Sequence, residues 1–157
     1  MEISLKLNNE DDLLNLTDLL LPLNYFNNFI YELENLKILD ERFENESNIK
    51  MLNNENIFRH QSSQTIKRRK GYVEIRTIQK KSPAFFELFL LVAPYVEETI
   101  KILVENKDIN IEEKLYNLLN EIESFKNLSE SKKRAIIRYI LLFFRLLLGY
   151  FTITINR

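Results

Sequence analysis

Apolar and polar residues alternate in three short stretches of the chain, which is the pattern of strands that bury one face. The first stretch covers residues 3–7, the second follows Gly71 and ends near Gln79, and the third covers residues 151–155. The alternation therefore predicts a small sheet of about three strands. It leaves the strand order open, and we expect mixed strand directions.

Two helical patterns lie between the first two strands. A polar, acidic cluster at residues 8–12 precedes a Leu-rich run, and such acids stabilise the positive end of a helix dipole. Pro22 either stops or kinks that helix, or begins the next one. Apolar residues then recur every three or four positions from Phe26 to about Leu39, which predicts a second amphipathic helix.

A third helix is predicted over residues 83–104. Ser82 and Pro83 form a start signal, with Ser as the N-cap and Pro at the first helical position. The run that follows is apolar on nearly all sides. Pro94 lies inside it, and we expect it to bend the helix because it removes a backbone hydrogen bond.

Two more helices are predicted towards the end of the chain. Asn110 and Glu113 form a capping-box pattern ahead of an apolar face that extends from residue 111 to residue 125. The final helix begins near Ser129 and ends near Leu148, with Gly149 expected as its C-terminal cap. Its three arginines, at 134, 138 and 145, predict a helix that is buried in the core except along one solvent-exposed side.

These elements predict the α+β class, with a small mixed sheet of about three strands packed against a layer of about five helices. The chain has 157 residues, is 45% hydrophobic and contains only two Gly, so we expect helices to dominate a single compact domain over residues 1–157. A polar connection occupies residues 40–70. Connections of this length are usually either mobile or functional.

The composition argues against most catalytic chemistry. The chain has no Cys, which excludes disulfides, thiolate zinc sites and cysteine nucleophiles. His60 is the only His, so a multi-histidine metal site is excluded, and no ordering acid completes a triad with the neighbouring Ser62 and Ser63. Two glycines cannot build a glycine-rich phosphate loop. The sequence therefore predicts a protein that is not an enzyme and that needs no cofactor or metal.

Compartment and source are indicated only by composition. Residues 1–7 carry Glu2 and Lys6 and lack the apolar run of a signal peptide. Together with the absence of Cys, this predicts a cytoplasmic, reducing location. The frequent Asn, Lys and Ile suggest an AT-rich coding sequence, which fits low-GC bacteria and their mobile elements and also some eukaryotes. The predicted source is a bacterium, a phage or another mobile element.

The apolar segments at 83–104 and 130–148 invite comparison with membrane spans. Two arginines, Arg138 and Arg145, interrupt the second segment, and each would cost roughly 2.5–3.5 kcal/mol at the centre of a bilayer. The uninterrupted apolar runs are also too short to cross it. We therefore do not expect integral membrane insertion.

Charge is strongly segregated along the chain. Residues 57–81 contain eight bases and one acid, whereas residues 1–56 contain twelve acids and four bases, although the whole chain has a net charge of −1. Such separation indicates either a partner or an acidic face of the same molecule. The predicted partner-binding residues are Arg59, Lys67, Arg68, Arg69, Lys70, Tyr72, Arg76, Lys80 and Lys81.

Three interpretations of this basic segment remain open. It could bind a partner, it could be a solvated loop, or it could pair with acids of the N-terminal third. Those acids are Asp11, Asp12, Asp18, Glu32 and Glu34.

The favoured prediction is a non-enzymatic interaction protein, such as an inhibitor, an antitoxin-like protein or a regulator, that binds a protein or ribonucleoprotein partner through residues 59–81. One alternative is a nucleic-acid-binding accessory protein, whose cations contact phosphates while Tyr72 stacks on a base. Another is a peripheral membrane or self-associating protein that uses the segments 83–104 and 130–148.

Overall fold

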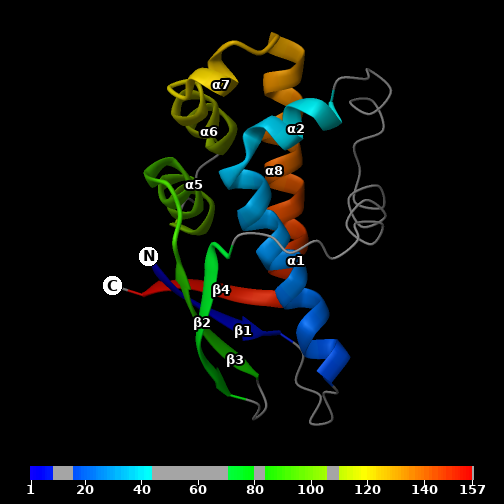
Figure 1. The fold of residues 1–157 in the computed structure, drawn as a ribbon, viewed down its shortest axis with the longest axis vertical. Coiled ribbons are helices and arrows are strands. Elements are labelled where there is room, and N and C mark those ends of the chain that lie inside the picture. Colours follow the sequence, from blue (N-terminus) through cyan, green and yellow to red (C-terminus); the bar gives the residue numbers. More distant parts are fainter. Residues whose placement is uncertain (9–15, 44–70, 80–83, 106–109, 157) are drawn as a thin grey trace.

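The computed structural model describes residues 1–8, 16–43, 71–79, 84–105 and 110–156. In these residues a four-stranded sheet lies at one end of the molecule and six helices extend from it (Figure 1). The strands are β1 (Glu2–Leu7), β2 (Val73–Gln79), β3 (Phe85–Leu90) and β4 (Phe151–Asn156). The helices are α1 (Leu16–Glu34), α2 (Leu36–Arg42), α5 (Pro94–Glu105), α6 (Ile111–Leu119), α7 (Glu123–Lys126) and α8 (Glu130–Tyr150). The predicted α+β class and the dominance of helices are confirmed.

The sheet has the order β2-β3-β1-β4, and every pair of neighbours is antiparallel. The prediction of about three strands in mixed directions is therefore wrong. The three strands indicated by alternation are present, and β3 is the additional one. Strands β1 and β4 lie side by side with Glu2 opposite Asn156, so the two ends of the described chain are neighbours (Figure 1).

Strand β3 occupies the first half of the segment that was predicted as a single helix at 83–104. Phe86, Leu88 and Leu90 are buried and alternate with half-buried residues, as expected for a central strand. The sequence is apolar at nearly every position, so periodicity alone does not separate helix from strand here. Pairing with β1 and β2 decides the outcome. Pro94 consequently begins α5 instead of bending a longer helix.

Three predicted helix boundaries also differ. Pro22 lies inside α1, which is continuous through it. The Asn110 side chain makes no capping hydrogen bond, and the helix expected to reach residue 125 is divided into α6 and α7. The predicted helix start at 82–83 lies outside the described residues. Most of the polar connection at 40–70 also lies outside them.

Helix α8 passes through Gly149 and ends at Tyr150, where β4 follows at once. Asn8, just after β1, explains why no glycine cap is needed. Its side-chain amide donates to the Leu148 carbonyl at 2.9 Å, and its backbone N–H donates to the Tyr150 carbonyl at 2.9 Å. Its side-chain oxygen accepts from the Thr152 hydroxyl at 2.7 Å. Asn8 thus satisfies carbonyls that the helix end leaves without partners.

Helix α8 is the central helix of the core. It packs against α1, α2, α6 and β4, and it buries residues along most of its length. Phe143 and Phe144 lie 5.2 and 6.1 Å from the ring of Phe29 on α1, which joins the two longest helices. The three arginines of α8 all lie on its exposed side, as the sequence predicts.

The helices cover three strands of the sheet well and the fourth poorly. Leu88 of β3 is 1% exposed, but Ile75, directly opposite it on β2, is 50% exposed. Residues directly opposite each other in an antiparallel pair point to the same face of the sheet. Ile75 therefore lies on the helix-facing side of the sheet but beyond the helices that bury Leu88.

This pair gives a direct test of the fold. Leu88→Ala should lower the free energy of unfolding by about 2–5 kcal/mol, because it leaves a cavity in the core. Ile75→Ala should cost less than about 1 kcal/mol, because half of that side chain is already in water. Urea unfolding followed by circular dichroism measures both values. Equal losses would show that Ile75 is buried in solution and would contradict the arrangement described.

Candidate partner-binding surface on strand β2

Two of the nine predicted partner-binding residues, Tyr72 and Arg76, belong to the described part of the chain. Arg76 lies in β2 and Tyr72 lies directly before it, and β2 is one of the two edge strands of the sheet. The basic run at 67–70 precedes this strand in sequence, and Lys80 follows it directly. The residues that lie outside the described part are Arg59, Lys67, Arg68, Arg69, Lys70, Lys80 and Lys81.

Arg76 occupies a β-bulge in this strand. Ile75 is opposite Leu88 and Thr77 is opposite Glu87, so Arg76 is the extra residue between two consecutive pairs. Its guanidinium lies 5.1 Å from the centre of the Phe89 ring, and one of its nitrogens is 3.4 Å from a Glu74 carboxylate oxygen. Both charged side chains are about half exposed. The ion pair therefore adds little to stability, and the cation remains accessible.

The bulge changes where the second isoleucine of β2 points. In a regular strand Ile75 and Ile78 would face opposite sides of the sheet, because side chains alternate. The extra residue instead brings Ile78 opposite Phe86, on the same helix-facing side as Ile75. Ile78 is 49% exposed. Two large apolar side chains thus lie together on an uncovered part of the sheet, which sequence alternation alone does not reveal.

The backbone of β2 also has an outer edge. The Leu91 N–H donates to the Tyr72 carbonyl at 2.8 Å, so the backbone groups of Tyr72 face β3. Hydrogen-bonding direction alternates along an antiparallel strand, and the register then directs the backbone groups of Val73, Ile75 and Ile78 away from β3. Within the described ranges no strand pairs with this outer edge.

Tyr72 has a packing contact in the structure. Its ring is half-buried and its centre lies 6.1 Å from that of Tyr31 on α1, with the two planes tilted by 43°. Its carbonyl bonds to Leu91, which leads from β3 to α5. These contacts join the start of β2 to the helical layer, and they do not favour Tyr72 as a platform for stacking a base.

Two of the N-terminal acids considered as partners for the basic segment have other contacts. A Glu34 carboxylate oxygen accepts the Ala93 N–H at 3.0 Å, just before α5 begins. The adjacent Tyr95 hydroxyl donates to the Leu33 carbonyl at 2.8 Å, and burial together with the Glu34 charge raises the pKa of Tyr95. The end of α1 is thereby joined to the start of α5. Glu34 has a structural role.

Glu32 belongs to a buried cluster. It is 2% exposed, and its two carboxylate oxygens lie 2.6 Å from an Arg42 nitrogen and 2.6 Å from the Tyr139 hydroxyl. Arg42 also donates to that hydroxyl. Burial opposes the charge of Arg42, but Glu32 and Tyr139 outweigh this effect and raise the pKa of Arg42. The cluster ties α1, α2 and α8 together.

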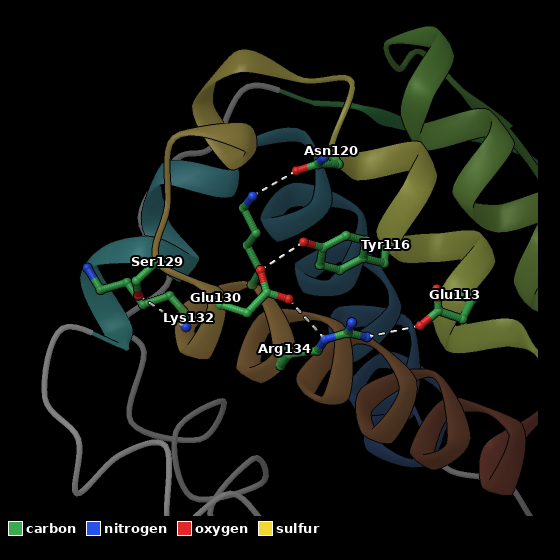
Figure 2. A network of polar contacts seen from close by, with 8 residues as sticks. Glu113, Tyr116, Asn120, Ser129, Glu130, Lys132 and Arg134 are labelled. Carbon is green, nitrogen blue, oxygen red and sulfur yellow. Dashed lines mark hydrogen bonds and ion pairs between the residues drawn. The ribbon is translucent and has the colours of Figure 1, made fainter.

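A more exposed network joins α6 to α8 (Figure 2). The Arg134 guanidinium lies between two carboxylates, 3.3 Å from Glu130 and 3.3 Å from Glu113, and 4.4 Å from the centre of the Tyr116 ring. The Tyr116 hydroxyl donates to Glu130 at 2.8 Å, which raises the pKa of Tyr116. The buried Lys133 ammonium donates to the Asn120 side chain at 2.8 Å, so α6 and α8 are cross-linked by polar contacts along their packed faces.

The described residues contain no group of three or more acidic or histidine side chains that could hold a metal ion. In the same residues no helix is both long and apolar enough to cross a membrane. The polar clusters of the helical layer consist of pairs that satisfy one another. The β2 surface differs from them, since it exposes apolar side chains, a cation and an outer backbone edge together.

Comparison of the chain with protein-family models, with curated proteins and with solved structures finds no match in any of the three.

The buried cluster leads to a prediction about stability. Glu32→Gln should lower the free energy of unfolding by about 3–5 kcal/mol, because Arg42 would remain buried beside a neutral group. The double variant Glu32→Leu/Arg42→Met should be more stable than Glu32→Gln, because it removes both charges. Chemical denaturation of the three proteins provides the values. If the double variant were less stable than Glu32→Gln, the loss in Glu32→Gln would not come from a buried, unpaired Arg42.

Proposed function

We propose that this chain is a non-enzymatic interaction protein that binds an acidic protein partner through β2 and the basic residues that bracket it in sequence. One observation carries the proposal: β2 is an edge strand on which Ile75 and Ile78 are half exposed on one face, and the half-exposed Arg76 lies beside Phe89 on the other. Exposed apolar groups accompanied by charge are typical of sites that bind macromolecules.

The two kinds of group have different tasks in this proposal. The seven basic residues outside the described part, together with Arg76, attract an acidic surface and raise the rate of association. The isoleucines then hold the partner, because contact removes their apolar surface from water. An inhibitor, an antitoxin-like protein or a regulator would act in this way, by occupying a surface of its target.

The chemistry of β2 favours a protein over a nucleic acid. A binder of nucleic acids combines cations with aromatic rings that stack on bases. Tyr72 is the only aromatic residue of the predicted set, and its ring packs beside Tyr31. The exposed apolar side chains of β2, Ile75 and Ile78, are aliphatic, and these suit contact with another protein.

The alternative of a peripheral membrane or self-associating protein required two apolar helices, at 83–104 and 130–148, and the first of these is not a single helix. Residues 85–90 form β3, so the predicted apolar helix at 83–104 is reduced to α5. Leu148 is the large apolar side chain of α8 that is exposed, and it lines a hollow with Leu141 and Phe144 of the same helix.

A charge-removal experiment tests the proposal. Binding of labelled polyglutamate should weaken by at least about tenfold, or 1.4 kcal/mol, when Lys67, Arg68, Arg69, Lys70 and Arg76 are all replaced by Ala. The control variant Arg138→Ala/Arg145→Ala removes two exposed cations from α8, far along the chain from β2, and should retain the affinity. Fluorescence anisotropy at low and physiological salt measures both.

A labelled single-stranded DNA is the competing probe in the same assay. Binding tighter than that of polyglutamate, with a salt slope of roughly −3 to −4 on logarithmic axes, would replace the proposed protein partner by a nucleic acid. If the β2 variant binds polyglutamate as well as the original chain does, the proposed surface is wrong.

A further inference from the structure

We infer that the partner binds by strand addition: an extended acidic segment of another protein pairs antiparallel with the outer edge of β2 and becomes a fifth strand of the sheet. This inference rests on the proposed function, which it deepens by naming the form of the partner. It rests on the backbone of β2, whereas the proposed function rests on the exposed side chains of β2 and on the basic residues.

The first step is the direction of the backbone groups. The N–H and C=O groups of Val73, Ile75 and Ile78 point away from β3, as the Tyr72–Leu91 hydrogen bond and the register require. An edge with such groups is a template for another strand. Recognition of extended peptides by strand addition uses main-chain hydrogen bonds for affinity and alternate side chains for specificity.

The second step is the coincidence of edge and apolar surface. Ile75 and Ile78 have outward-facing backbone groups, and their side chains lie on the uncovered helix-facing side of the sheet. In an antiparallel pair, a residue of the incoming strand that bonds to Ile75 or Ile78 places its side chain on that same face. Apolar residues at alternate positions of the partner would therefore cover both isoleucines.

The third step is charge. The remaining alternate residues of the incoming strand would lie on the opposite face, where Arg76 is stacked beside Phe89 and paired with Glu74 at 3.4 Å. The sequences on both sides of β2 are basic, with four consecutive cations at 67–70 and two at 80–81. Acidic side chains at these positions would be complementary to Arg76 and to both flanks. The occupant is thus a segment with alternating apolar and acidic residues.

Charge also argues against a second copy of this chain as the occupant. Pairing of β2 with itself about a two-fold axis would place the same surface patch on both sides of the contact. The contact would then bring together two chains that carry the same basic residues next to β2 in sequence, and like charges placed together oppose association. A heterologous acidic strand meets no such repulsion.

The test uses a fluorescein-labelled peptide of about ten residues with alternating Val and Glu, a length typical of strands. In antiparallel addition the Val residues bond to β2 and the Glu residues direct their N–H groups outward. N-methylation of the Val amides should weaken binding by at least about tenfold, because it removes donors and blocks the approach. N-methylation of the Glu amides is the matched control and should leave the affinity within about twofold.

A variant of the chain supplies a second measurement. Ile75→Ser/Ile78→Ser should weaken binding of the unmodified peptide by at least about tenfold while binding of polyglutamate is unchanged, because only the peptide covers the isoleucines. The side chains are half exposed, so the variant should remain folded by circular dichroism. If this variant also lost polyglutamate binding, the isoleucines and the basic residues would not have the separate roles proposed for them.

The outcomes distinguish this inference from the proposed function. If polyglutamate binding depends on the basic residues but both methylated peptides bind like the unmodified one, strand addition is overturned and the proposed function stands. Loss caused only by methylation of the Glu amides would overturn the antiparallel direction. If the chain binds neither the peptide nor polyglutamate at low salt, both proposals fail. Both would also fail if another segment of this chain occupied the outer edge of β2.

Discussion

Burial of the helix-facing side of the central strands is the interaction on which the rest of the structure depends. Ile3 and Leu5 of β1 lie opposite Leu88 and Phe86 of β3, and all four are 0–1% exposed beneath the helices. Helix α8 extends this core by packing against α1 and α6 and by continuing directly into β4. Because the helices are fixed over the central strands, β2 at the edge of the sheet lies partly beyond them. The candidate surface is therefore a consequence of how the core is built.

Strand β2 combines features that protect an edge with features that invite a partner. Edge strands commonly carry charges and bulges that discourage unwanted pairing, and β2 has both in Glu74, Arg76 and the bulge at Arg76. The same bulge places Ile75 and Ile78 on one uncovered face. Exposed isoleucines do not contribute to the protection of an edge. We propose that the combination serves selective pairing, in which Arg76 and the basic residues on either side of β2 in sequence favour acidic strands.

The sequence predicted some elements well for a clear physical reason. Strands β1 and β4 each have one face more exposed than the other, so alternation reveals them. Alternation in the sequence also indicated β2, although both of its faces are largely exposed. Strand β3 lies between two other strands and is apolar at every position except Glu87, which leaves too weak a period to detect. The orientation of Ile78 was hidden because a bulge changes the alternation by one residue. The contacts of Glu32 with Tyr139 join positions 107 residues apart, and only the packing of α1 on α8 brings them together.

Amide hydrogen exchange of the free chain, resolved by residue with NMR, tests the central claim most directly. The N–H groups of Val73, Ile75 and Ile78 should exchange much faster than those of Glu74 and Thr77, because only the latter two face β3. Alternation of fast and slow exchange along this strand is the result expected for an open edge. Slow exchange at all five positions would show that the edge is already paired in the free chain, and it would contradict β2 as an accessible binding surface.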